Sequence, residues 1–98
     1  MSSALSIHAA AETEINEAAD YYDLESSGLG GVFLDEVERA LAQVTDFPDA
    51  AAPVRAGVHR RLLRKFPYAL LYSLRADEIR ILAVAHQKRR PFYWHGRE

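Results

Sequence analysis

The stretch YALLYSLRADEIRILAVAH, residues 68–86, decides the fold of this chain. Its first part, Tyr68 to Leu74, is almost entirely apolar or aromatic, which is typical of a central strand buried on both faces. Residues 75–78 (RADE) supply a hairpin turn, and Ile79 to His86 is a second apolar run of strand length. The stretch therefore predicts a hairpin at the centre of a sheet.

The segments on either side of this hairpin differ from each other. Residues 58–64 (VHRRLLR) alternate apolar or branched residues with arginine, which predicts a further strand. Along that strand Arg60 and Arg64 share one face, and Arg61 shares the other with His59 and Lys65. The segment before it, residues 49–57, is rich in Ala and Pro and is predicted to be a loop, whereas residues 87–98 form a basic, aromatic tail.

Two helices are predicted upstream of the strands. Over residues 10–24 an apolar face is formed at helical spacing by Ile15, Ala18, Ala19 and Tyr22. The turn Ser26-Ser27-Gly28 ends this helix. Over residues 29–47 the apolar stripe comprises Phe33, Val37, Ala40, Leu41 and Val44. The other side of that second helix is expected to carry Asp35, Glu36, Glu38 and Arg39.

A short first strand is predicted at Leu5 and Ile7, which alternate with polar residues. The element order is then β-α-α-β-β-β. We expect an α+β fold in which a helical hairpin packs on one face of a mostly antiparallel sheet, with residues 1–98 forming a single domain.

Charge is distributed very unevenly along the chain, although the net charge is only −2. Residues 1–54 contain one basic and eleven acidic residues, and residues 55–98 contain eleven basic and three acidic residues, so the two parts carry −10 and +8. This asymmetry indicates a polyanionic or acidic partner for the second part, or ion pairing between the two parts on folding.

Several classes of protein are disfavoured by composition. The chain has no cysteine, which excludes disulfides and thiolate chemistry and fits the cytoplasm. No signal peptide is visible, and no stretch approaches the length of apolar sequence that a membrane span requires. The four histidines show no metal-ligand spacing, so we predict no metal and no cofactor.

Taken together, the motifs resemble those of the RelE/ParE superfamily of toxins. The matching pieces are residues 17–22 (EAADYY), 28–30 (GLG) with Phe33, 37–41 (VERAL), Arg61, 66–68 (FPY) with Tyr72, 81–86 (ILAVAH), 89–91 (RRP), Tyr93, Trp94 and Arg97. Their order and spacing cover almost the whole chain. The resemblance implies a toxin that is neutralised by a co-expressed antitoxin, in a hetero-oligomer with it.

Family members differ in their cellular target. ParE-like toxins bind and inhibit DNA gyrase, whereas RelE-like toxins cut mRNA in the ribosomal A site. A third possibility is a non-toxic domain that binds a protein or a nucleic acid. If the chain is a ribonuclease, the resemblance implies His86, Arg61 and Tyr93 as catalytic residues; otherwise His86 orients the tail by hydrogen bonds. Lys65 and Lys88 are the only lysines, which disfavours the lysine-rich groove of the ribonucleases and favours the ParE-like branch without catalytic residues.

Candidate binding residues follow from the distribution of basic and aromatic side chains. Interleaved basic and aromatic residues in the tail suit a nucleic acid, but they also fit rings that pack while the cations remain solvated. Contacts with the target are predicted for Arg61, Arg64, Lys88, Arg89, Arg90, Tyr93 and Trp94. Contacts with the antitoxin are predicted for Tyr21, which lies off the apolar stripe of its helix, and for Arg60.

Overall fold

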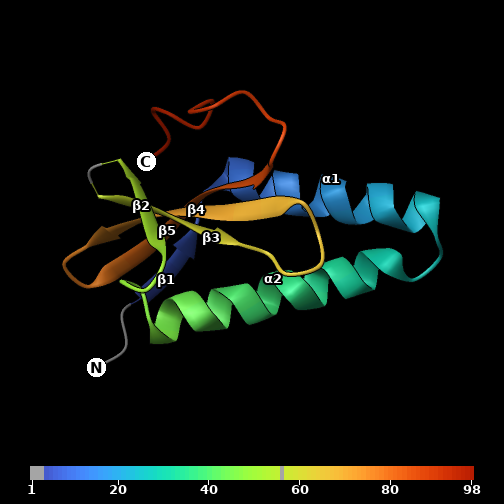
Figure 1. The fold of residues 1–98 in the computed structure, drawn as a ribbon, viewed down its shortest axis with the longest axis horizontal. Coiled ribbons are helices and arrows are strands. Elements are labelled where there is room, and N and C mark those ends of the chain that lie inside the picture. Colours follow the sequence, from blue (N-terminus) through green and yellow to red (C-terminus); the bar gives the residue numbers. More distant parts are fainter. Residues whose placement is uncertain (1–3, 56) are drawn as a thin grey trace.

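The computed structural model describes residues 4–55 and 57–98. It contains β1 (Ala4–Ile7), α1 (Ala9–Glu25), α2 (Leu29–Asp46), β2 (Ala52–Arg55), β3 (Val58–Leu62), β4 (Tyr68–Arg75) and β5 (Glu78–His86). The helices form a hairpin whose turn extends beyond the end of the sheet (Figure 1). The predicted α+β fold with its helical hairpin is confirmed.

The strands form one sheet in the order β1-β5-β4-β3-β2. The predicted hairpin supplies its centre, because β4 pairs antiparallel with β5 and with β3. β1 pairs parallel with β5, which makes the sheet mixed. The strand that begins the chain therefore lies beside the strand that ends the hairpin, and both helices connect it to the rest of the sheet.

The loop predicted for residues 49–57 is wrong in part, because Ala52–Arg55 forms the edge strand β2. This strand pairs antiparallel with β3, and the register shifts between Pro53 and Arg55. Proline lacks an amide hydrogen, and an edge strand tolerates this because one side of the strand has no neighbour. Four residues with one proline show no periodicity, so only the pairing with β3 reveals the strand.

The main core lies between the helices and one face of the sheet. Phe33, Leu70, Tyr72 and Ile81 are all 0% exposed there. Aromatic rings fill the part of this core near the turn between α1 and α2, where the ring centroids of Tyr22 and Phe66 are 4.8 Å apart. The predicted stripe of α2 is confirmed at Phe33, Val37, Ala40 and Val44, and Leu41 is partly buried.

Glu36 departs from the predicted polar side of α2, since it is only 4% exposed. Its Oε2 lies 3.7 Å from Arg39 Nη1, and its Oε1 has no hydrogen-bond partner among the described residues. Glu36 follows Phe33 by three positions and precedes Ala40 by four, so it borders the apolar stripe. Tertiary packing extends over this border, and helical periodicity alone does not show how far the packing reaches.

A second apolar cluster lies on the outer face of the sheet, the face opposite the helices. It consists of Val58, Ala69, Leu71, Leu82, Ala83 and Trp94. Strand β5 reaches both cores because its side chains alternate between the two faces of the sheet. A β-bulge interrupts this alternation: Leu71 pairs with Ala83 and Tyr72 pairs with Ile81, which leaves Leu82 as the extra residue. After the bulge Val84 contributes to the helix-facing core again.

Neither described helix combines the length and apolar character that a membrane crossing requires.

Candidate functional site

A groove on the outer face of the sheet lies beside several of the predicted target-binding residues. Its volume is about 220 Å³. The floor is apolar and comes from β3, β4 and β5, and one wall is the tail that follows β5. We call this surface the outer groove; it is lined by Val54, Arg60, Leu62, Ala69, Leu71, Ala85, His86, Gln87, Arg89, Arg90, Pro91, Phe92, Tyr93 and Trp94.

The tail that forms this wall is anchored to Glu14 of α1. The hydroxyl of Tyr93 donates to Glu14 Oε2 at 2.8 Å, and the Arg97 guanidinium donates to both carboxylate oxygens at 3.0 and 3.2 Å. Glu14 Oε1 also accepts the backbone amide of Val84 at 3.0 Å. Because β1 pairs with β5 only as far as Ile81, Glu14 satisfies an amide that lies beyond the end of β1.

Burial and the hydrogen bond to Glu14 raise the pKa of Tyr93 well above its usual value. The negative charge of Glu14 acts in the same direction, since it opposes formation of a phenolate. Cations lie over the ring, with Arg89 Cζ 4.0 Å from the ring centroid and Arg97 Cζ 5.1 Å from it. Tyr93 is therefore a neutral hydrogen-bond donor that orders the tail, held by its hydroxyl and by the cations that contact its ring.

His86 ends β5 beside the outer groove. Its Nδ1 accepts the backbone amide of Lys88 at 3.0 Å. Its ring meets Tyr68 in an edge-to-face contact with the centroids 5.1 Å apart. Both contacts lie where the tail leaves the sheet.

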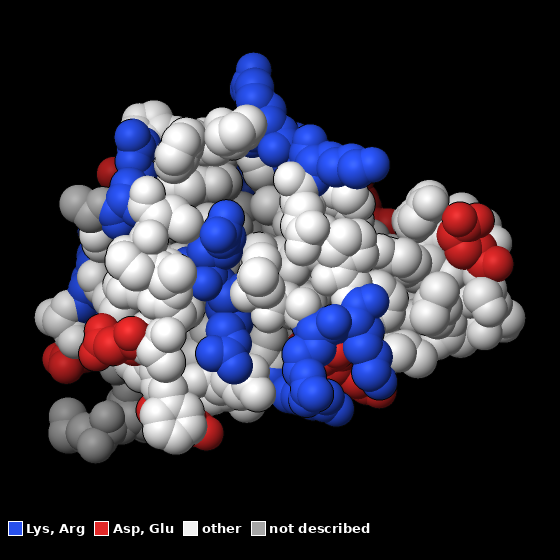
Figure 2. All heavy atoms as spheres, viewed as in Figure 1, with Lys and Arg blue, Asp and Glu red and all other residues white. Residues whose placement is uncertain are grey.

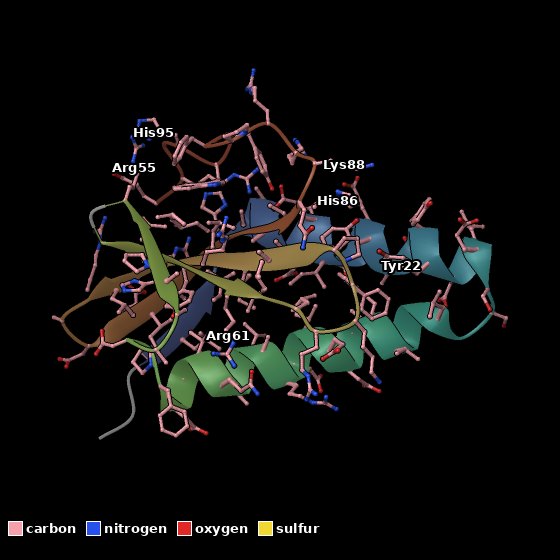
Figure 3. All side chains as sticks on the ribbon, in the orientation of Figure 1. Tyr22, Arg55, Arg61, His86, Lys88 and His95 are labelled. Atoms are coloured by element: carbon pink, nitrogen blue, oxygen red, sulfur yellow. The ribbon has the colours of Figure 1, made fainter. Side chains whose placement is uncertain are left out.

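Arg61 lies on the helix-facing side of β3. Its Nη2 donates to Gln43 Oε1 of α2 at 2.6 Å. Arg61 pairs with Leu70 of β4, and Leu70 pairs with Val84 of β5. The buried strand β4 therefore separates Arg61 from β5. Figure 3 shows Arg61 next to α2 and His86 at the opposite side of the strands. Of the three ribonuclease candidates, His86 and Tyr93 both line the outer groove, whereas Arg61 lies on the other side of the sheet.

The predicted target-binding residues fall into two groups. Lys88, Arg89 and Arg90 are exposed at the start of the tail, next to the outer groove. Arg61 and Arg64 lie instead near α2, at the end of β3 and just after it. Trp94 is only 6% exposed and belongs to the outer-face core, which agrees with the packing alternative for this ring.

The two predicted antitoxin-binding residues lie on different surfaces. Tyr21 is 54% exposed on α1, and its hydroxyl donates to Glu25 Oε1 at 3.2 Å. Arg60 is exposed on β3 and lines the outer groove. A partner that touches both would have to extend from the outer groove to the exposed side of α1.

Several residues of this site were missed at the level of sequence. Leu62 and Phe92 are 52% and 46% exposed at the outer groove, and Arg55 lies 4.8 Å from the centre of the Phe92 ring. The Arg55 guanidinium also donates to His95 Nδ1 at 2.8 Å, and Figure 3 shows the two together. Glu14 carries no local signal beyond its place near the start of a helix, because its partners lie 70 to 83 residues away in sequence.

Comparisons with known proteins agree with this architecture. A solved structure described as the chromosomal ParDE TA system from P. aeruginosa matches with a TM-score of 0.65 and 18% sequence identity, over 86% of this chain and 95% of that one. This likeness shows the fold. No curated protein matches this chain. The family described as "ParE toxin of type II toxin-antitoxin system, parDE" matches residues 5–91. Because that match covers most of the sequence, the chain belongs to the ParE toxin family of type II toxin–antitoxin systems.

Proposed function

We propose that this ParE-family toxin inhibits growth by binding DNA gyrase and that it does not cut mRNA. The observation that carries the proposal is the separation of Arg61, which is bonded to Gln43 of α2, from His86 and Tyr93, which line the outer groove. General acid–base cleavage of RNA requires an acid, a base and a cation within hydrogen-bond reach of one phosphate. Here Arg61 is bonded to Gln43 near α2, and Tyr93 is bonded to Glu14.

The outer groove supports binding to a protein surface. Leu62 and Phe92 expose apolar area, while Arg60, Arg89 and Arg90 surround it with fixed positive charge. Protein interfaces are enriched in aromatic residues and arginine relative to the rest of the surface. The energy of such contacts is concentrated in a few large side chains. We therefore assign contact with gyrase to the outer groove together with Lys88, Arg89 and Arg90.

The ParDE system implies an antitoxin as a second partner. We infer that it forms a hetero-oligomer with this chain and makes contacts at Tyr21 and Arg60. Arg60 also lines the outer groove, so an antitoxin that covers it would hinder access of gyrase to the same surface. Neutralisation would then follow from competition for one surface.

Two variants test the proposal. His86→Gln retains a side chain that hydrogen-bonds, whereas the triple variant Lys88/Arg89/Arg90→Ala removes the charge beside the groove. We expect the triple variant to lose toxicity on induction in a bacterium and to inhibit gyrase supercoiling at least tenfold more weakly in vitro, and His86→Gln to retain both effects. Cellular mRNA should remain intact during induction of the native chain.

Folding is checked by circular dichroism and by copurification with the antitoxin, so that loss of toxicity is not caused by unfolding. A catalytic base contributes on the order of a hundredfold or more to rate. If well-folded His86→Gln is inert and the native chain cuts mRNA at ribosomes, the chain is a ribonuclease and the gyrase proposal fails.

A further inference from the structure

A second basic surface lies away from the tail, where β3 and the turn after it meet α2. Arg61 belongs to β3, Arg64 and Lys65 follow that strand, and Arg39 projects from α2. Figure 2 shows basic side chains gathered over the middle of this face, below those of the tail, with some acidic atoms visible between them. We call the four residues Arg39, Arg61, Arg64 and Lys65 the β3 strip.

One of these cations is held by a hydrogen bond, one is only loosely paired, and two are free to adapt. Arg61 is bonded to Gln43, and Arg39 lies 3.7 Å from the Glu36 carboxylate. Arg64 and Lys65 are exposed and make no side-chain hydrogen bond or ion pair within residues 4–55 and 57–98. Such a surface has one oriented cation, Arg61, and other cationic side chains that can follow an extended ligand.

The strip is also sterically open. The pairing of β2 with β3 reaches only Arg60, so within residues 4–55 and 57–98 no strand lies beside this edge of β3 from Arg61 onward. Glu36 lies under the strip, but it is 4% exposed and presents almost no surface to solvent. The negative charge of Glu36 offsets one of the four positive charges of the β3 strip. The strip and Glu36 together therefore carry a net charge of +3.

We propose that the β3 strip binds the phosphate backbone of double-stranded DNA. Several guanidinium and ammonium groups on one surface suit a polyanion whose phosphates repeat along its length, and arginine can bond a phosphate through two N–H groups. Beside Arg64 and Lys65 the described rings are largely covered, because Phe66 is buried and Tyr68 packs 5.2 Å from Phe33, and the single exposed ring of Phe47 lies one helical turn beyond Gln43. Proteins that bind single strands use aromatic platforms for the unstacked bases, so a closed duplex fits this surface better.

This surface is separate from the outer groove, and the proposal does not rest on the identity of the toxin's target. The test measures anisotropy of a fluorescent 20-base-pair DNA duplex with the purified chain at 50 to 200 mM salt. Each phosphate contact contributes about 0.9 to the magnitude of the slope of log K against log salt concentration, so loss of a contact reduces the slope by that amount. We expect Arg64→Gln/Lys65→Gln to reduce the magnitude of that slope by about 2, with binding at least tenfold weaker at the lower salt concentration.

The matched control is Arg75→Gln/Arg80→Gln, which removes the same charge from the β4–β5 hairpin. It should retain the native slope and bind within about threefold of the native chain, since net charge alone acts only weakly at a distance beyond the Debye length. Equal loss in both variants, or no binding by the native chain at 50 mM salt, overturns the proposal.

Three further probes separate the kinds of ligand. The single-stranded DNA of the same sequence, the corresponding RNA duplex and a poly-glutamate peptide of equal charge are compared at one salt concentration. Stronger binding of any of these than of duplex DNA assigns the strip to that class and contradicts our proposal. Gyrase inhibition by the Arg64→Gln/Lys65→Gln variant is measured in parallel, so that failure of DNA binding and failure of the target assignment are distinguished.

Discussion

Glu14 shows how much one side chain contributes to this molecule. Its carboxylate accepts four hydrogen bonds, which come from Val84, Tyr93 and twice from Arg97. Hydrogen bonds to a charged group are stronger than those between neutral groups, and partial burial reduces screening by solvent. A single residue of α1 thereby holds the last strand and the tail in one arrangement.

Tyr93→Phe should weaken this anchor and change the response to alkaline pH. A free phenol ionises near pH 10, whereas Tyr93 in the folded chain keeps its proton to higher pH. The raised pKa stabilises the fold fully below pH 10, and this contribution is lost as pH rises from there toward the folded value.

In urea titrations we expect Tyr93→Phe to cost about 1–3 kcal/mol at pH 7. Above pH 10 its free energy of unfolding should fall less steeply than that of the native chain, by up to about 1.4 kcal/mol per pH unit. Parallel curves for the two proteins above pH 10 would show that the Tyr93 proton is not retained on folding.

The helical hairpin is set by a close approach of its two helices at Gly30. The backbone amide of Gly30 donates to Asp23 Oδ1 at 2.7 Å. A Cβ atom at this position would meet the carbonyl oxygen of Ala19, and it would lie 2.7 Å from Asp23 Cγ. The neighbouring Gly31 has no such restriction, since nothing lies within 4 Å of its Cβ position.

Gly30→Ala should therefore destabilise the chain by about 1–3 kcal/mol, because α1 and α2 must move apart. Gly31→Ala should stabilise it by about 0.5 kcal/mol, since alanine loses less backbone entropy in a helix. Thermal unfolding of both variants measures the difference. Similar effects of the two substitutions would mean that α1 and α2 do not approach closely at Gly30.

At the scale of the whole molecule, the chain builds two cores on opposite faces of one sheet. The helices cover one face, and the tail covers part of the other with Trp94. Phe92 stands beside Trp94 with the ring centroids 5.7 Å apart, but it remains 46% exposed. The tail is thus both a structural cover and the wall of the outer groove.

Trp94→Ala should cost about 3–5 kcal/mol, because it opens a cavity against Leu71 and Leu82. Phe92→Ala, the neighbouring control, should cost about 1 kcal/mol or less, since its ring is partly solvated already. Chemical denaturation provides both values. If Phe92→Ala is the more destabilising variant, the exposed ring of Phe92 holds the tail, and Trp94 is not the main contact of the tail with the outer face of the sheet.

The sequence by itself determined the elements whose signals are local. Hydrophobic runs in residues 68–86 located the central hairpin, and helical spacing around Phe33 and Val37 located α2. The order of short motifs was enough to indicate the toxin family. These features could be predicted because side-chain periodicity reflects which face of an element is buried.

Only the tertiary structure decided the features that depend on distant partners. Strand β2 exists because β3 lies beside it, and Glu36 is buried because packing reaches the border of the helical stripe. The candidate site shows the same limit: Glu14 meets Arg97 across 83 residues, and Arg61 turns to α2, away from His86. Periodicity assigns a residue to a face, but it does not specify which distant residue lies opposite.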